Sequence, residues 1–324
     1  MDRHSTDLDG RNDLGADDAD PAIPLGPEPL GSDDASLIAK SDLRLRVPEK
    51  LTNLAELDVH YDLADCALWT LMRPIGRPSF TPSMLDDFVV WQDLIAGHFG
   101  PCRLPLKYLV LGSRTPGVFC FGGDLTLFRQ LICDQDRKGL IAYGYRCVEI
   151  LNRNFNALGL PTLTIGLVQG QALGGGFEAL LSFDYIVAER QSTFGLPEST
   201  FGLFPGMGAH VLLTRKLGSA LADRLILSNR TYSAQDMYDL GIVHDVVEPG
   251  EGVAAVRDFI ARSGRKHAGL VNAKRALRVS SRIEMEEFYR IVELWAEAAL
   301  QLREQDLKLM NRLANAQTRL AAAS

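Results

Sequence analysis

Three consecutive glycines, at positions 174–176, stand between an apolar run at 162–168 and a second apolar stretch that begins at Phe177. The first run has the length and composition of a buried strand, and the residues after the glycines are typical of a helix. A strand that passes into a helix through glycine exposes backbone amides, towards which the positive end of the helix dipole also points. The segment therefore predicts an α/β unit whose helix start binds an oxyanion.

Similar units recur along the chain. Short apolar runs predict strands, and apolar residues at helical spacing predict helices between them. The predicted strands are 43–47, 57–61, 67–72, 108–111, 162–168, 185–188 and 244–247, and the predicted helices include 81–98, 125–133 and 139–158. Repeated strand–loop–helix units favour an α/β fold class with ligand-binding loops at the strand ends.

The first 40 residues differ from the rest in composition. They are rich in Asp, Gly and Pro and poor in large apolar residues, so we expect a disordered acidic tail. The chain carries a net charge of −7, and residues 1–35 hold ten acids against two arginines, which leaves the remainder nearly neutral. A nucleic-acid partner is therefore not expected.

Other features of the composition concern localisation. No apolar run reaches the ~18 residues of a membrane span, and the acidic N-terminus does not resemble a signal peptide. The five cysteines are an odd number, scattered and without a C-x-x-C pair. This pattern favours a reduced, cytoplasmic protein over a disulfide framework or a zinc site.

Glu178 lies about one turn into the helix that the glycines begin, close to whatever their amides bind. Glutamate is also common as a solvent-facing residue of a first helical turn, because the helix dipole stabilises its charge. The flanking Leu173 and Phe177 favour an enclosed site over that alternative. Glu178 is therefore a candidate for proton transfer.

The same glycines also fit a dinucleotide-binding pattern. Gly174-x-Gly176-x-x-Ala179 matches the fingerprint, and Glu198 lies about twenty residues further on, where a ribose-binding acid is expected. In that motif the glycine turn follows its strand directly, whereas Gly174 comes six positions after Val168. Glu198 also lies in a Gly/Pro-rich loop and not at a strand end, so the context counts against this alternative.

Glu198 is the second candidate for acid–base chemistry. It follows Phe194-Gly-Leu-Pro, with no neighbouring Lys or Arg, a setting that favours desolvation and a raised pKa. One predicted helix and one predicted strand separate it from Glu178, a path that can return the chain to the same edge. Two carboxylates at an oxyanion hole suit proton removal beside a carbonyl and proton delivery to a leaving hydroxyl. The alternative is an exposed loop acid.

A third glycine-rich segment, Gly117-Val-Phe-Cys-Phe-Gly-Gly-Asp124, contains Cys120 between Phe119 and Phe121. Its glycines can turn amides inward, and the two rings can line an apolar tunnel. Cys120 is either a nucleophile or the donor of a backbone amide. No histidine near in sequence would activate its thiol, which favours the backbone role.

Together these segments resemble the crotonase, or enoyl-CoA hydratase/isomerase, superfamily over about residues 57–264. The shared motifs are F-x-x-G-x-D at 119–124, G-x-A-x-G-G-G-x-E at 170–178, G-x-P-E at 195–198, L-x-P-G-x-G at 203–208 and A-x-x-x-x-x-x-G-I-V at 234–243. The resemblance implies a crotonase-type spiral of ββα units with a helical C-terminal region. It also implies that the amides of Cys120 and Gly175 form an oxyanion hole and that Glu178 and Glu198 are the acid–base pair.

A narrower resemblance is to diffusible signal factor synthases. It rests on residues 121–128, 168–179 and 203–209, and on the tail around 295–301 and 309–317. It implies a dehydratase and thioesterase that converts a 3-hydroxyacyl thioester on acyl carrier protein into a free cis-2-unsaturated fatty acid for quorum sensing. The alternatives are an ordinary enoyl-CoA hydratase and a crotonase-like protein that binds acyl thioesters or a regulator without turnover.

The resemblance also sets expectations for the rest of the molecule. We expect a crotonase core at 41–264, a helical region at 265–324, and a homo-oligomer, either trimer or hexamer. No metal or redox cofactor is implied, because elimination and hydrolysis need only acid–base groups, an oxyanion hole and the thioester of acyl carrier protein or coenzyme A. The residues expected to shape the acyl pocket are Phe119, Phe121, Leu173, Phe204, Met207 and Trp295.

The stretch from 283 to 320 contains no Pro or Gly and is dense in good helix formers. Its apolar residues step by three and four, which predicts one long two-faced helix. The apolar stripe comprises Phe288, Val292, Trp295, Ala299, Leu302, Leu309, Leu313, Ala316 and Leu320. Such a stripe must be covered by the core, by another subunit or by an acyl chain.

Overall fold

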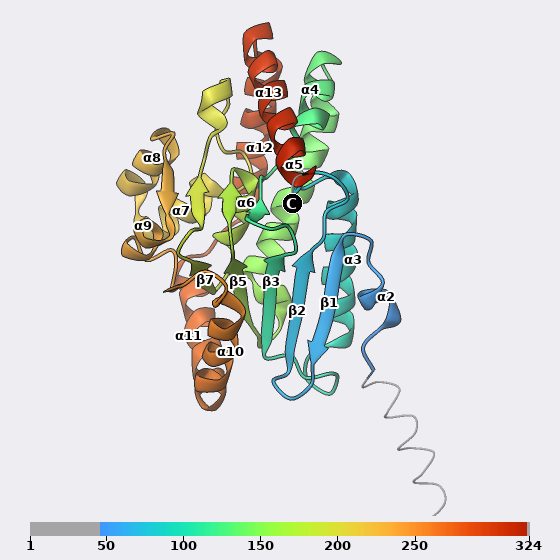
Figure 1. The fold of residues 1–324 in the computed structure, drawn as a ribbon, viewed down its shortest axis with the longest axis vertical. Coiled ribbons are helices and arrows are strands. Elements are labelled where there is room, and N and C mark those ends of the chain that lie inside the picture. Colours follow the sequence, from blue (N-terminus) through green and yellow to red (C-terminus); the bar gives the residue numbers. More distant parts are fainter. Residues whose placement is uncertain (1–45, 323–324) are drawn as a thin grey trace, which may run out of the picture. The chain divides into compact units, whose positions relative to one another are not determined.

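Two sheets organise the fold, and the larger one carries the strands that the sequence predicts. The computed structural model describes residues 46–322 of the chain. The order in the larger sheet is β1 (Leu57–Asp62), β2 (Ala67–Met72), β3 (Tyr108–Ser113), β5 (Leu163–Val168), β7 (Tyr185–Glu189) and β10 (Asp245–Val247). β1 pairs antiparallel with β2, and the other neighbours are parallel (Figure 1). The predicted strands at 57–61, 67–72, 108–111, 162–168, 185–188 and 244–247 are confirmed to within two residues at each end, whereas the strand predicted at 43–47 lies mostly outside the described residues.

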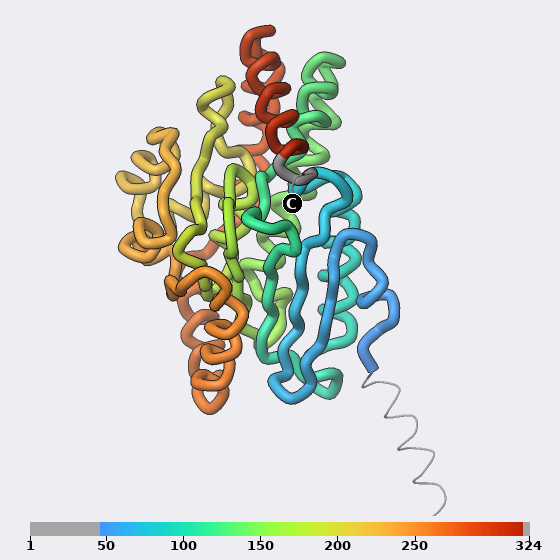
Figure 2. The backbone as a smooth tube through the Cα atoms, in the orientation of Figure 1, coloured from blue at the N-terminus to red at the C-terminus, as the bar shows by residue number. Residues whose placement is uncertain are grey.

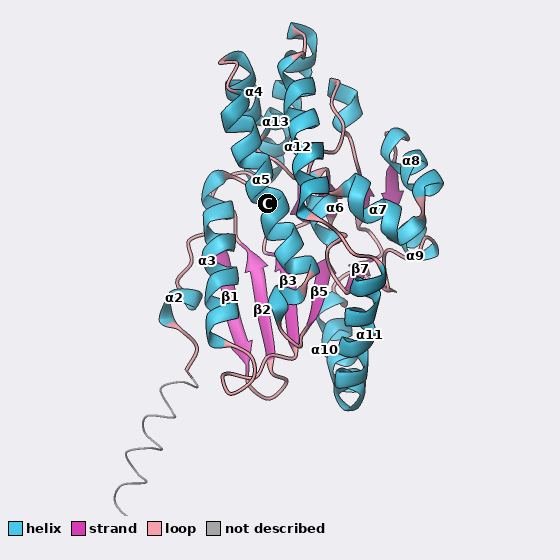
Figure 3. Ribbon diagram, turned by 180° about the vertical axis from the view of Figure 1, so that it is seen from behind, coloured by secondary structure: helices cyan, strands magenta, loops and turns pink. Residues whose placement is uncertain are grey.

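The central strands are apolar throughout because helices cover both faces of the larger sheet. Every residue of β5 is buried. One face packs against α3 (Pro82–His98) and α5 (Arg137–Phe155), which Figure 3 shows in front of the strands, and the other against α10 (Gly252–Ser263) and α11 (His267–Ser280). Successive residues of β3 therefore alternate between two cores, with Leu109 on the α3 side and Val110 on the α10 side.

The smaller sheet joins β4 (Val118–Cys120), β6 (Gln171–Leu173), β8 (Thr193–Gly195) and β9 (Thr231–Ser233). Each of its first three strands follows a strand of the larger sheet, since β3 leads into β4, β5 into β6 and β7 into β8. The helices that follow these pairs are α4 (Leu125–Cys133), α6 (Gly175–Leu180) and the 3-10 helix η2 (Glu198–Phe201). This repetition of two strands and a helix is the expected spiral of ββα units.

The helices begin where the sequence offers capping side chains. Thr81 precedes α3 and accepts a hydrogen bond from the amide of Met84 at 3.2 Å. Asp124 precedes α4 and accepts from the amides of Thr126 and Leu127 at 3.0 and 3.2 Å. The predicted helices at 81–98 and 125–133 are thus confirmed, and that at 139–158 corresponds to α5 and the short η1 (Ala157–Gly159).

The C-terminal region is helical, but it forms two helices where a single one was predicted. α12 (Met285–Leu300) packs on α5, and α13 (Glu304–Ala322) packs on α4. Between them the amide and guanidinium of Arg303 each donate to Oδ2 of Asp306 at 3.1 Å. A side-chain carboxylate that satisfies the first amides starts a new helix without Pro or Gly. In Figure 2 the red tube of α13 runs beside the green α4 towards the carboxyl ends of the strands.

The remaining elements complete the described part of the chain. They are α2 (Glu49–Thr52), α7 (Ala209–Leu217), α8 (Ser219–Leu227), α9 (Ala234–Asp239) and η3 (Gly264–Lys266). Across residues 46–322, none of the helices has the length and apolar character needed to cross a membrane. The acidic tail predicted at 1–40 lies outside the described residues.

Candidate active site

Glu178 is fixed by the main chain of a segment far along the sequence. It lies in α6, and only 1% of its surface is exposed. Its Oε1 accepts hydrogen bonds from the amides of Met207 and Ala209, both at 2.9 Å. These amides lie where the loop after η2 enters α7. Two main-chain donors therefore hold the carboxylate in one orientation and stabilise its charged form.

The environment of Glu178 suits a proton acceptor. Burial raises the pKa of Glu178 from 4.5 to about 7, and the hydrogen bonds from Ala209 and Met207 oppose this shift. Desolvation disfavours the ionised form, while the two amides favour it. A carboxylate whose pKa lies near neutrality is an effective general base at physiological pH.

Glu198 faces the same site from a different unit of the spiral. It begins η2 and is partly buried, and a Cβ at Gly174 would lie 2.7 Å from its Oε1. Its Oε2 is shielded from solvent and has no hydrogen-bond partner among residues 46–322. Burial, and then the negative charge of Glu178, raise the pKa of Glu198 well above its ordinary value. Two neighbouring carboxylates resist ionising together, so a charged Glu178 favours the protonated form of Glu198.

A cavity of about 220 Å³ joins the two glutamates. Four of the six predicted pocket residues line it, namely Phe121, Leu173, Met207 and Trp295. Gly175, predicted to donate an oxyanion amide, also lines it. The sequence motifs thus converge on one enclosed volume.

The glycines allow the close approach of two ββα units. A Cβ on Gly176 would lie 2.2 Å from the carbonyl oxygen of Cys120, and one on Gly122 would lie 2.5 Å from the amide nitrogen of Gly175. Phe177 and Glu178 both donate to the carbonyl of Gly174, so the amide of Gly175 precedes the helical hydrogen-bond ladder. That amide is available to a ligand in the cavity.

β6 also separates β5 from the glycines, which does not fit the dinucleotide alternative.

Cys120 lies beside the site and does not line the cavity. Its side chain is buried, and its Sγ accepts from the amide of Gly122 at 3.3 Å. Burial raises the pKa of Cys120 to about 12. Because the thiolate is the reactive form, a nucleophilic role for this thiol is disfavoured.

Two predicted pocket residues lie away from the cavity. Phe119 is 2% exposed and packs in the hydrophobic core. β4 ends at Cys120, so the strand alternation does not extend to Phe121 and the two rings do not share a face. Phe204 packs edge-on against His210, with ring centroids 5.6 Å apart. Neither ring therefore contacts a ligand in the cavity as the structure stands.

The structure also adds residues that the sequence did not suggest. Leu313, Ala316 and Gln317 of α13 line the cavity beside Trp295 of α12. The C-terminal stripe therefore covers the site as well as the core. The amides of Met207 and Ala209 were likewise missed, because main-chain donors leave no residue-type signal. Only the L-x-P-G-x-G motif at 203–208 marks their position.

Comparisons with known proteins agree with this architecture. The family profile described as enoyl-CoA hydratase/isomerase matches residues 104–294. The fatty acid oxidation complex subunit alpha of Idiomarina loihiensis is 38% identical over 141 residues, which are 43% of this chain and 19% of that protein. The chain thus matches about a fifth of the length of this curated relative.

Solved structures show the same fold at lower identity. DspI of Pseudomonas aeruginosa is 24% identical, with a TM-score of 0.61 over 74% of this chain and 95% of that one. An enoyl-CoA hydratase of Bacillus halodurans is 18% identical, with a TM-score of 0.67 over 80% of this chain and all of that one. At these identities the likeness concerns the fold alone, and it confirms the predicted fold class.

Proposed function

The chain belongs to the enoyl-CoA hydratase/isomerase family, and we propose that within it the protein is a dehydratase with thioesterase activity. Its substrate is a 3-hydroxyacyl thioester, and its product is a free cis-2-unsaturated fatty acid that serves as a quorum-sensing signal. The observation that carries this proposal is that amide-bound Glu178 and Glu198, whose pKa is raised, line one cavity.

The two carboxyls divide the elimination between them. Ionised Glu178 removes a proton from C2, and the amide of Gly175 stabilises the charge that develops on the thioester oxygen. Glu198 gives its proton to the 3-hydroxyl, so that the C3–O bond breaks and water leaves. The C2–H electron pair becomes the new double bond. The proton gained by Glu178 and the one lost by Glu198 balance, and exchange with solvent restores both groups.

Hydrolysis uses the same groups in a second step. An ionised glutamate takes a proton from water as the oxygen attacks the thioester carbonyl, and the amide of Gly175 holds the tetrahedral oxyanion. The C–S bond then breaks, and the thiol leaves with a proton. The buried thiol of Cys120 takes no covalent part. The motif resemblance at 121–128, 168–179 and 203–209 and the covering of the cavity by α13 support this second step.

The carrier of the substrate is proposed to be acyl carrier protein, and the protein is proposed to act as a trimer or hexamer. Product analysis separates this function from its main alternative, an ordinary enoyl-CoA hydratase, which the fatty acid oxidation relative favours. Purified protein is incubated with 3-hydroxyacyl thioesters of acyl carrier protein and of coenzyme A, and products are identified by mass spectrometry.

A free acid with a cis double bond is the expected product of the wild-type protein. Glu198→Gln is the matched control, because it keeps the shape of the side chain but cannot supply the proton. Accumulation of trans-2-enoyl-CoA without free acid would instead establish the hydratase. Binding of either thioester without any product would establish a protein without turnover.

A further inference from the structure

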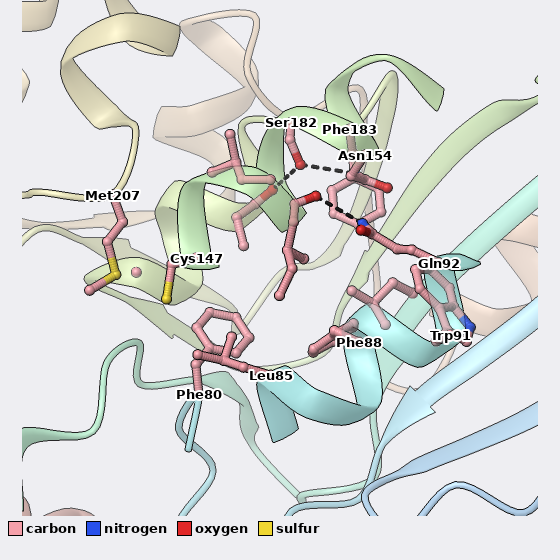
Figure 4. A pocket seen from close by; sticks show the side chains of 15 residues that line it. Phe80, Leu85, Phe88, Trp91, Gln92, Cys147, Asn154, Ser182, Phe183 and Met207 are labelled. Carbon is pink, nitrogen blue, oxygen red and sulfur yellow. Dashed lines mark hydrogen bonds between the residues drawn. The ribbon is translucent and has the colours of Figure 1, made fainter. Parts of the chain in front are cut away.

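A second cavity lies directly behind the active site. It provides about 50 Å³ of space between α3, α5 and the residues that follow α6 (Figure 4). Gly175 and Met207 line both this cavity and the one that holds the glutamates. The two volumes therefore meet at the residue proposed to bind the thioester oxygen. The side chain of Met207 lies beside this residue, since a Cβ at Gly175 would lie 3.6 Å from its Sδ.

Most of this second cavity is apolar. Its walls include Phe80, Leu85, Phe88, Trp91, Leu151 and Phe183. Such a lining favours a hydrocarbon chain over a polar ligand. An unbranched thioether at the junction adapts its shape easily, so Met207 can move aside for a chain that begins in the active site.

The end of the cavity furthest from Met207 is polar. Figure 4 shows Gln92, Asn154 and Ser182 gathered there, while Met207 and Cys147 lie at the opposite end. Nε2 of Gln92 donates to the carbonyl of Ile150 at 2.8 Å. Nδ2 of Asn154 donates to Oγ of Ser182 at 2.8 Å, and that hydroxyl donates in turn to a main-chain carbonyl at 2.6 Å.

These hydrogen bonds fix the orientation of both amides. A carbonyl oxygen only accepts, so Gln92 must turn its NH2 group towards Ile150. The hydroxyl of Ser182 already uses its proton, so Asn154 must donate to it. The oxygens of Gln92 and Asn154 are therefore acceptors that these interactions leave free.

Neither of these two oxygens has a hydrogen-bond partner within residues 46–322. Gln92 is fully buried, and Asn154 is 6% exposed. A buried acceptor without a donor destabilises the folded state, so native proteins seldom retain one. The end of a plain alkyl chain would leave both oxygens unpaired, whereas a hydroxyl group would donate its single proton to one of them.

We propose that this second cavity binds the distal part of the acyl chain, and that the side-chain oxygen of Gln92 or Asn154 accepts a hydrogen bond from a hydroxyl group carried near the end of that chain. The inference rests on the proposed function, because the chain enters from a thioester bound at Gly175. It adds a substrate class, namely 3-hydroxyacyl thioesters with a second hydroxyl near the chain end. Gln92 and Asn154 are then residues that determine substrate specificity.

Binding of free fatty acids tests the inference without any need for turnover. Isothermal titration calorimetry compares ω-hydroxy fatty acids with methyl-terminated acids of equal length over a series of chain lengths. At the best length the hydroxylated acid is expected to bind about three- to tenfold more tightly, as one net hydrogen bond allows. Gln92→Leu or Asn154→Leu should reduce this ratio, according to which oxygen accepts the proton, and their combination should abolish or reverse it.

Thr162→Val is the matched control. Thr162 is fully buried, its Oγ1 also lacks a partner within residues 46–322, and it does not line the cavity. The Thr162→Val substitution should leave the ratio of the two binding constants unchanged. A ratio of one at every chain length in the wild-type protein would overturn the inference, even where a leucine variant fails to fold. A preference for the hydroxylated acids that persists in the folded double variant would also overturn the inference.

Turnover separates this inference from the proposed reaction. The ratio of kcat/KM for hydroxylated and methyl-terminated 3-hydroxyacyl thioesters is expected to follow the ratio of the binding constants. Preferential binding of the hydroxylated acids without any turnover would uphold the second cavity and refute the reaction. Turnover with equal kcat/KM for both series would instead uphold the reaction and refute the proposed role of the second cavity.

Discussion

Met207 donates a main-chain hydrogen bond to Glu178 and also lines two neighbouring cavities. Its amide donates to Oε1 of Glu178 at 2.9 Å, and its side chain lies where the two cavities meet at Gly175. One residue thus orients the proposed base and borders the space for the substrate. Substitution of the Met207 side chain is expected to alter chain selectivity, because the amide that holds Glu178 is kept.

Replacing either glutamate by glutamine should abolish most of the activity while the fold remains. Glu178→Gln and Glu198→Gln keep the side-chain shape but remove a proton-transfer group, which typically contributes about 10²–10⁴-fold in rate. Steady-state kinetics on a 3-hydroxyacyl thioester, with circular dichroism as a check of folding, measures the effect. Near-normal turnover by either variant would remove that residue from the mechanism.

The pH dependence of turnover should follow the same pair. The pKa of Glu178 is raised to about 7, so kcat/KM for dehydration should rise with pH up to about 7 as this base ionises. It should fall again at higher pH, where Glu198 loses the proton that the leaving hydroxyl needs. A pH–rate profile measures both limbs. A flat profile through neutral pH would exclude Glu178 as the base.

The free energy of unfolding should fall with rising pH over the same range in which the rate of turnover rises. The folded-state pKa of Glu178 is raised from 4.5 to about 7, so within this window the folded protein binds a proton that the unfolded chain has lost. The free energy of unfolding therefore falls as the pH rises through the window. Glu178→Gln removes this contribution, so its Tm relative to wild type should be higher at about pH 8 than at about pH 5. Thermal denaturation at both values measures the difference, and an equal difference would contradict the raised pKa.

Part of the site could be read from the sequence because its signals are carried by residue types. Buried strands appear as apolar runs, and Glu178 and Glu198 stand out as acids among apolar residues and glycines. One helix and one strand separate the two glutamates, a path that can return the chain to the same edge, and in the structure both glutamates line one cavity. The prediction that Cys120 supplies an oxyanion amide stays a prediction, since its backbone packs against α6 but does not line the cavity.

Other features depend on contacts that leave no such signal. Gln92 and Asn154 lie on α3 and α5 among apolar neighbours, and only the packing of these helices brings them together. The division between α12 and α13 depends on Asp306, which is one of many acids in a stretch of good helix formers. Periodicity alone therefore predicted one continuous helix. The motif around Phe119 predicted that this residue lines the pocket, but in the structure its side chain is buried in the hydrophobic core.

The thiol of Cys120 should be unreactive in the folded protein. Its burial and raised pKa leave almost no thiolate at neutral pH, so thiol reagents should modify it only after denaturation. Mass spectrometry of the alkylated protein checks this, with the exposed Cys102 and Cys133 as internal controls. Cys120→Ala should slow hydrolysis by much less than either glutamate variant. Loss of hydrolysis with dehydration intact would make the thiol a nucleophile.

The adjacent glycines Gly175 and Gly176 should respond differently to alanine. A methyl group on Gly176 would lie 2.2 Å from the main-chain oxygen of Cys120, so Gly176→Ala must displace backbone and should lower Tm strongly. At Gly175 the nearest atom would be 3.3 Å away, so Gly175→Ala should fold. Its methyl group would enter the junction of the cavities and reduce turnover. Thermal denaturation and kinetics together test the pair, and equal stability of the two variants would contradict the packing described.

Removal of α13 should impair catalysis more than folding, because this helix closes the active site from outside the spiral of ββα units. Leu313, Ala316 and Gln317 line the cavity, and the helix packs on α4 and η2. A chain ending at residue 302 would keep α12 and Trp295 but open the cavity to water. We expect KM for long-chain thioesters to rise and bound acyl chains to dissociate faster, while removal of residues 283–324 exposes the core and causes aggregation. Light scattering and kinetics on both truncations measure these effects. A soluble, monomeric and fully active protein lacking residues 283–324 would refute both the oligomer and the role of these helices in covering the acyl chain.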